Sequence, residues 1–182
     1  MCKGRKINVF SEKDIILAKK GNEESFVRLI ESCELSLYRV ARGLLSNDND
    51  CADAIQETIL KSFRSIRKLK QPKYFKTWIT RILINECHNI LRKKQTVVPV
   101  EDIEYYLSDR FLGDPAQSIS EAIGELDEKH RAPVILYYYE DFSVKEIAEL
   151  LEISTGTVKS RLNRARAKLS VYLSEERGIG NA

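Results

Sequence analysis

The stretch GTVKSRLNRARAKL, residues 156–169, contains five cations and no carboxylate. Read as a helix, at about 100° per residue, it places its apolar residues on one stripe. The stripe consists of Val158, Leu162, Ala165 and Leu169. The opposite side holds Lys159, Ser160, Asn163 and Arg164. Such a helix packs by one face and offers the other face to an anion.

A second helix is predicted directly before this stretch. Ser143 and Glu146 form a capping box ahead of the apolar IAELL, residues 147–151, and EIS at 152–154 is typical of a short turn. Two helices joined in this way, the second more basic, form a helix-turn-helix unit, which favours DNA binding. The alternative is a plain helical hairpin with a solvated basic face.

The first half of the chain is also predicted to be helical, because apolar residues recur at helical spacing and strand signals are nearly absent. We expect helices at 11–20, 22–45, 50–68 and 72–94. Ser11, Asn22 and Asp50 are the expected N-caps, and Pro72 suits a first helical turn. In the second half, helical structure is expected to restart at Ser118, with Pro133 either in a first turn or at a kink.

Charge is distributed in blocks, although the net charge is only +3. Residues 61–94 hold eleven Lys or Arg and a single acid, whereas residues 95–128 hold nine acids and a single Arg. Prolines and the loss of helical periodicity at 95–117 indicate a flexible acidic linker. The predicted fold is therefore all-α, with two small helical domains at 1–94 and 118–182.

Composition argues against several classes of protein. The 182 residues are 43% apolar and 31% charged. No apolar run reaches the roughly 20 residues of a membrane span, and no segment resembles a signal peptide, so we expect a cytoplasmic protein without membrane insertion. The Cys and His residues lack metal-ligand spacing, and we expect no metal, cofactor or small-molecule substrate. Adjacent Cys87 and His88 leave one alternative, an enzyme, although neighbours on a helix point about 100° apart.

Three stretches resemble a known family. FSVKEIAELLEISTGTVKSRLNRARAKL, residues 142–169, is similar to the region 4 helix-turn-helix of bacterial extracytoplasmic-function (ECF) sigma factors. DAIQETILKSF, residues 53–63, resembles the polymerase-binding helix of region 2, and FKTWITRILINECHNILRKK, residues 75–94, resembles its promoter-melting helix. A free-standing helix-turn-helix regulator, the main alternative, explains the first match but not the other two. The resemblance implies a non-enzymatic protein that gives core RNA polymerase its promoter specificity.

The resemblance also implies three sets of contact residues. Those for the upstream (minus-35) element are Thr157, Lys159, Ser160, Arg161, Asn163, Arg164 and Arg166. Those for the minus-10 element are Lys73, Tyr74, Phe75, Lys76, Trp78, Arg81, Asn85, Asn89 and Arg92. Those for core polymerase are Asp53, Ile55, Gln56, Glu57 and Ile59. Core packing is the alternative for the aromatic residues and the isoleucines, and a solvated helix start is the alternative for Asp53.

Family members are commonly held inactive by a membrane-associated anti-sigma factor, so the resemblance implies such a partner and a role in a stress or envelope response. Three residues depart from the family pattern. Asn89 stands where Asp is frequent, Asp127 stands where Pro is typical, and Pro133 is uncommon. The first departure lies in the melting helix, and the other two lie in the first region 4 helices.

Overall fold

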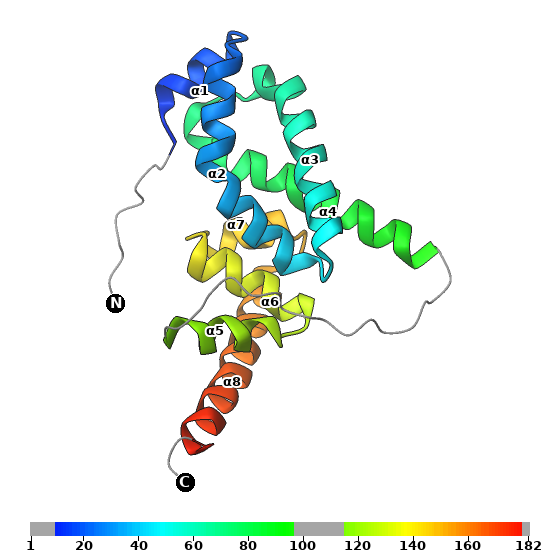
Figure 1. Ribbon diagram of the computed structural model, residues 1–182, viewed down its shortest axis with the longest axis vertical. Helices are drawn as coiled ribbons and strands as arrows, with labels where there is room; N and C mark the ends of the chain where they lie inside the picture. The colour runs from blue at the N-terminus through cyan, green and yellow to red at the C-terminus, as the bar shows by residue number, and fades with distance from the viewer. Residues whose placement is uncertain (1–9, 97–114, 180–182) are drawn as a thin grey trace. The chain divides into compact units, whose positions relative to one another are not determined.

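The computed structural model describes residues 10–96 and 115–179 (Figure 1). Every regular element within these two ranges is helical, which confirms the all-α prediction. Contacts between Cα atoms divide the chain after residue 98 into two units. The helices extend to residue 96 and resume at residue 115, so both ends of the predicted 95–117 linker are helical. The rest of that linker lies outside the described residues.

The described part of the first unit contains four α-helices and two short 3-10 turns. They are α1 (Glu12–Lys19), α2 (Glu23–Leu44), α3 (Asp48–Ser65), η1 (Ile66–Lys68), η2 (Pro72–Tyr74) and α4 (Phe75–Thr96). Helix α2 packs on α1, α3 and α4, and α3 packs along α4. Small buried residues on α3, including Cys51, Ala54 and Ser62, let α3 and α4 approach closely. Large apolar residues such as Leu29 and Leu83 fill the core, each contributing about 1.5–3 kcal/mol.

The caps explain where these helices begin. The Asp14 amide donates to Ser11 Oγ at 3.2 Å and the Ser25 amide to Asn22 Oδ1 at 2.8 Å, so both predicted caps are confirmed. The third prediction is wrong, since Asn47 rather than Asp50 caps α3. The Tyr38 hydroxyl, 3.3 Å away, and the Arg42 guanidinium, 3.2 Å away, bind Asp48 from α2 and stabilise the additional first turn.

The second unit is built around its last helix. Its elements are α5 (Pro115–Gly124), α6 (Glu128–Val134), the π-helical turn η3 (Ile135–Tyr139), α7 (Val144–Leu150) and α8 (Thr155–Ile179). Helices α5, α6 and α7 all pack on α8. Helix α5 begins at Pro115 rather than at the predicted Ser118, and proline is well suited to a first helical position.

Pro133 lies near the end of α6, not in its first turn, and a π-helical turn follows it. Proline has no amide hydrogen to donate to the preceding turn. Beyond it the helix widens, and the Glu140 amide donates to the Ile135 carbonyl at 3.1 Å, five residues back. Of the two predicted positions for Pro133, the first turn is therefore wrong, and a wider turn follows the proline.

The capping box of the helix-turn-helix is confirmed. The Glu146 amide donates to Ser143 Oγ at 3.2 Å, and the Ser143 amide donates to Glu146 Oε2 at 2.8 Å. In the turn that follows α7, Glu152 has a φ of 54°, in the left-handed region. A side chain carrying a Cβ is strained there.

We expect Glu152→Gly to stabilise the α7–α8 pair by about 0.5–1 kcal/mol, because glycine adopts this φ without a steric clash. Hydrogen exchange of the α7 and α8 amides measures this effect separately from the first unit. Glu152→Ala is the control, since it removes the carboxylate but keeps the Cβ. Equal protection in the two variants would contradict the strain argument.

Candidate nucleic-acid and polymerase interfaces

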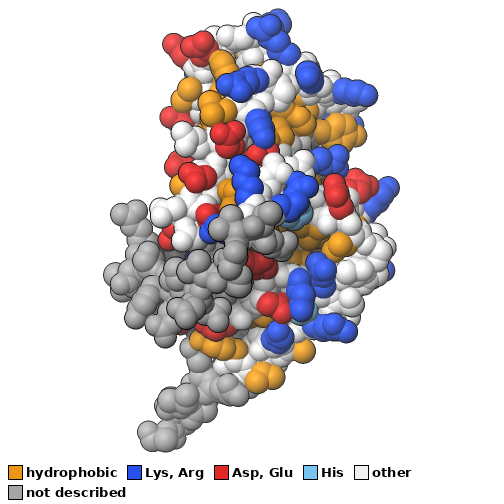
Figure 2. All heavy atoms as spheres, turned by 90° about the vertical axis from the view of Figure 1, so that its right-hand side faces the viewer, with side chains coloured by type: hydrophobic (Ala, Val, Ile, Leu, Met, Phe, Trp, Pro, Cys, Tyr) orange, Lys and Arg blue, Asp and Glu red, His pale blue; other side chains and the backbone are white. Residues whose placement is uncertain are grey.

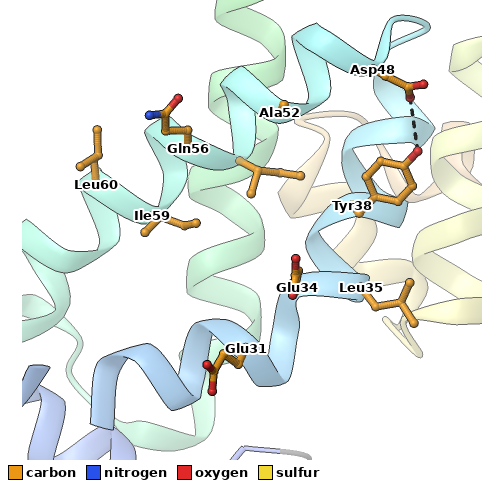
Figure 3. Close-up of a pocket in the computed structure, with 10 residues that line it drawn as sticks. Glu31, Glu34, Leu35, Tyr38, Asp48, Ala52, Gln56, Ile59 and Leu60 are labelled. Carbon is orange, nitrogen blue, oxygen red and sulfur yellow. Dashed lines mark hydrogen bonds between the residues drawn. The ribbon is translucent and has the colours of Figure 1, made fainter. Parts of the chain in front are cut away.

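A surface groove lies between α2 and α3 (Figure 3). Its lining residues are Glu31, Glu34, Leu35 and Tyr38 from α2, and Asp48, Ala52, Ile55, Gln56, Ile59 and Leu60 from α3. Leu35 is 53% exposed and Leu60 is 42% exposed, which is unusual for large apolar side chains in one concave region. Apolar side chains together with three carboxylates suit a protein segment that carries apolar and basic residues.

Three of the five predicted polymerase-binding residues line this groove. These are Ile55, Gln56 and Ile59. Asp53 and Glu57 are exposed on α3 but lie outside the lining. The α2 side of the groove was missed by sequence reasoning, although Leu35 and Tyr38, three residues apart on a helix, offered a signal because both lie off the buried stripe of α2.

Tyr38 and Asp48 join the two walls of the groove (Figure 3). The Tyr38 hydroxyl donates to Asp48 Oδ1 at 3.3 Å. Partial burial, with the nearby Asp48 carboxylate adding to it, raises the pKa of Tyr38. The phenol therefore stays protonated near neutral pH and remains a donor to Asp48.

Helix α4 presents a polar face to solvent. Arg81, Asn85 and Arg92 are all exposed, and their spacing places them within about 40° of one another around the helix. At its start, Tyr74 is 52% exposed and Lys73 Nζ lies 4.9 Å from the Tyr74 ring centroid. Exposed aromatic and cationic side chains of this kind suit an unpaired base and its phosphate.

The burial of Phe75 contradicts its predicted role as a DNA contact. Its side chain is 1% exposed, and its ring packs edge-on against Phe10 with centroids 5.1 Å apart. Phe75 therefore holds the start of α4 in the core. Trp78 and Lys76 are half-buried, and the Trp78 ring lies 5.9 Å from that of Phe75.

Asn89 is half-buried on α4 and hydrogen-bonded on both sides of its amide. Its Nδ2 donates to Glu86 Oε2 at 3.3 Å, and its Oδ1 accepts from Arg92 Nη2 at 2.6 Å. Asn89 thus lies behind the exposed face of α4 and contacts Arg92, which belongs to that face.

Helix α8 has the two faces that its sequence predicts. Val158, Leu162 and Ala165 are at most 4% exposed. The opposite face is exposed and consists of Lys159, Ser160, Asn163 and Arg164. Arg161 is half-buried and Arg166 is exposed at the flanks. The Arg166 guanidinium donates to Asn163 Oδ1 and, at 3.3 Å, to the Leu162 carbonyl.

Thr157 belongs to the start of α8. Its amide donates to Ser154 Oγ at 3.0 Å, and its hydroxyl lies 2.8 Å from the same oxygen. Ser154 thus caps the helix, as expected for a serine at this position. Thr157 is half-buried and contributes to this cap.

Charge on the face drawn in Figure 2 is mixed. Lys and Arg side chains lie among acidic and hydrophobic ones, and no single-sign surface covers the described residues of this face. On this face, local groups of side chains rather than one surface of a single sign are available for binding.

Cys87 and His88 do not form a reactive pair. Cys87 is fully buried, and this burial raises the pKa of its thiol to about 12. The protonated, enclosed thiol is a poor nucleophile. Among residues 10–96 and 115–179, no group of three His, Cys, Asp or Glu side chains is arranged to hold a metal ion. Within the described ranges, none of the helices combines the length and the hydropathy that a membrane span requires.

Two protein-family models match the chain. Sigma-70 region 2 matches residues 29–97, which include the groove and the whole of α4. Sigma-70 region 4 matches residues 116–169, which include the helix-turn-helix.

Relatives of the chain include the ECF RNA polymerase sigma factor SigM of Mycobacterium tuberculosis. It is 31% identical over 156 residues, covering 84% of this chain and 79% of SigM. The chain belongs to the ECF sigma factors of the sigma-70 family. A second relative, the RNA polymerase sigma factor SigV of Bacillus subtilis, is 29% identical over 160 residues, covering 87% of this chain and 96% of SigV.

Solved structures resemble this ECF sigma factor as well. RpoE of Bartonella quintana, in complex with the anti-sigma factor NepR, has a TM-score of 0.67 and 25% identity over 83% of this chain and 98% of RpoE. CnrH, in complex with the cytosolic domain of CnrY, has a TM-score of 0.63 and 23% identity over 92% of this chain and 99% of CnrH, and shares the fold. Membership of the sigma factors rejects both the enzyme and the free-standing regulator alternatives.

Proposed function

We propose that this ECF sigma factor binds core RNA polymerase through the groove between α2 and α3, and that α4 and α8 contact the two promoter elements. The observation that carries the proposal is the presence, in one chain, of an exposed apolar groove in the region 2 match and an exposed polar face on α8 in the region 4 match. A duplex-binding regulator needs the second feature but not the first.

The polymerase segment that enters the groove carries apolar and basic side chains. Ile55, Gln56 and Ile59 contact it from α3, and Leu35 and Tyr38 contact it from α2. Asp53 and Glu57 flank the groove on the exposed side of α3 and attract the cations of the partner.

For the upstream element, α8 lies in the major groove. Arg164 and Asn163 contact base edges, with Lys159 and Ser160 beside them, because all four lie on the face opposite the packing stripe. Arg161 and Arg166 contact phosphates from the flanks. Thr157 acts indirectly, by capping the helix that carries these residues.

For the minus-10 element, α4 holds the displaced strand. Tyr74 stacks on an unpaired base while Lys73 neutralises its phosphate. Arg81, Asn85 and Arg92 continue along the exposed face. Trp78 and Lys76 support the start of this face from half-buried positions.

The domain division follows from these roles. Residues 1–94 form the polymerase-binding and minus-10 domain, and residues 118–182 form the minus-35 domain. Residues 95–117 connect the two domains, although α4 continues to residue 96 and α5 begins at residue 115. The protein acts in the cytoplasm, where promoter DNA and polymerase are present. An anti-sigma factor controls the protein, and the structural likeness to RpoE in its complex with NepR supports this proposal. The protein serves a stress response or an envelope response.

Transcription with sigma-free core polymerase tests the proposed function. RNA from one defined start is expected only when this protein is added to core polymerase and a template from its own genome. Tight binding to duplex DNA without association with the core enzyme would overturn the proposal.

We expect Asn85→Ala to reduce promoter opening by about 5–30-fold, because one hydrogen bond to an extruded base is lost. Permanganate reactivity of unpaired thymines measures opening, and footprinting measures duplex binding, which should change by less than about twofold. Lys93→Ala is the control, since Lys93 is exposed on the same helix. Equal losses of opening and duplex binding would contradict this role of Asn85.

A further inference from the structure

A chain of polar contacts links α3 to the exposed end of α4. Lys61 Nζ lies 2.7 Å from Glu86 Oε2, and the same oxygen accepts from Asn89 Nδ2 at 3.3 Å. Asn89 Oδ1 accepts from Arg92 Nη2 at 2.6 Å. We refer to Lys61, Glu86, Asn89 and Arg92 as the α3–α4 relay.

Burial decreases along the relay from Glu86 outwards. Glu86 is 8% exposed, Asn89 is half-buried and Arg92 is exposed. A carboxylate placed so deeply needs a cation and hydrogen-bond donors, and Lys61 and Asn89 supply them. The inner end of the relay is therefore fixed, and the outer end reaches the face assigned above to promoter DNA.

The amide of Asn89 is the group that both neighbours require. It donates to a carboxylate through nitrogen and accepts from a guanidinium through oxygen, which only Asn or Gln does with one short side chain. An aspartate at this position has no hydrogen to donate, and it would place a second carboxylate beside Glu86, which is unfavourable. Glu86 thus accounts for asparagine at position 89.

We propose that Glu86 is a positioning residue for promoter binding, acting through Asn89 to hold the Arg92 guanidinium towards a phosphate of the minus-10 strand. Arg92 Nε also donates to the His88 carbonyl at 3.4 Å, so the guanidinium is held at two points. A side chain already ordered loses less entropy when it binds. This inference rests on the proposed role of α4.

Exchanging the donor and acceptor roles of positions 86 and 89 tests the relay. Asn89→Asp is expected to weaken the open complex by about fivefold to tenfold, because the introduced carboxylate cannot donate to Glu86 and is repelled by it. The side chain at position 89 then turns away from Glu86 and holds the Arg92 guanidinium in a different direction. In the Glu86→Gln background, the introduced glutamine amide donates to the introduced aspartate, which in turn accepts from Arg92. The double variant is therefore expected to recover to within about twofold of wild type.

A second readout separates positioning from stability. Loss of one phosphate contact lowers the slope of log affinity against log salt by about one, and an unstable fold does not produce that change. Asn89→Asp should show the smaller slope, and the double variant should restore it. Lys93→Ala, which removes an exposed cation outside the relay, should weaken binding by the same factor with and without Glu86→Gln.

The outcomes are distinguishable. Wild-type protein that opens the promoter with core polymerase, together with additive effects of Glu86→Gln and Asn89→Asp, overturns the relay and leaves the proposed function intact. Failure of the wild-type protein to open any promoter overturns the proposed function itself. Recovery in the double variant, with unchanged unfolding midpoints, supports the relay.

Discussion

Leu35→Glu is expected to weaken binding to core RNA polymerase by about 30-fold or more, the loss that defines an interface hot spot, because it removes an apolar contact and introduces a charge in the groove. Leu35 is 53% exposed in the groove between α2 and α3, whose lining already holds carboxylates. A further carboxylate there removes apolar contact and must be desolvated when the partner binds. Fluorescence anisotropy of labelled protein titrated with sigma-free core enzyme gives the affinity.

Val27→Glu is the matched control for this variant. Val27 lies on the same helix and is 52% exposed, but it is outside the groove lining. Val27→Glu introduces the same charge at nearly the same exposure, so this variant should change the affinity for core enzyme by less than about threefold. Similar losses in both variants would show that α2 does not contribute a specific polymerase contact.

Arg164→Ala is expected to reduce discrimination of the upstream element by about 5–150-fold, corresponding to the loss of one bidentate contact to a base. Arg164 is exposed on α8, opposite the buried Val158 and Leu162. Because Arg164 is exposed, its replacement by alanine should leave the fold unaffected. The measurement is the ratio of transcripts from two templates, one with the native upstream element and one with that element scrambled.

Lys168→Ala is the matched control on α8. Lys168 is also an exposed cation, and its Nζ lies 3.7 Å from an Asp127 carboxylate oxygen. Its removal should weaken binding to both templates by a similar factor and leave their ratio within about twofold of wild type. A ratio that falls equally in both variants would mean that Arg164 does not contact a base.

Local patterns account for the correct sequence predictions. The caps Ser11 and Asn22 and the capping box at Ser143 depend on side chains within three residues of each other. The wrong predictions depend on distant residues. Arg42 of α2 binds Asp48 and stabilises a first turn ahead of Asp50, which Asn47 caps. Phe10 and the core cover Phe75, for which the sequence predicts a DNA contact.

The sequence alone determined the two faces of α8, the all-helical fold and the family, because helical periodicity and short motifs are set by neighbours along the chain. Only the tertiary structure decided which exposed residues share a site. Leu35 and Ile59 line one groove from two helices, and Lys61 reaches Glu86, because helix packing brings together side chains that lie more than a helical turn apart in sequence. Such contacts depend on how the helices pack, which no local pattern specifies.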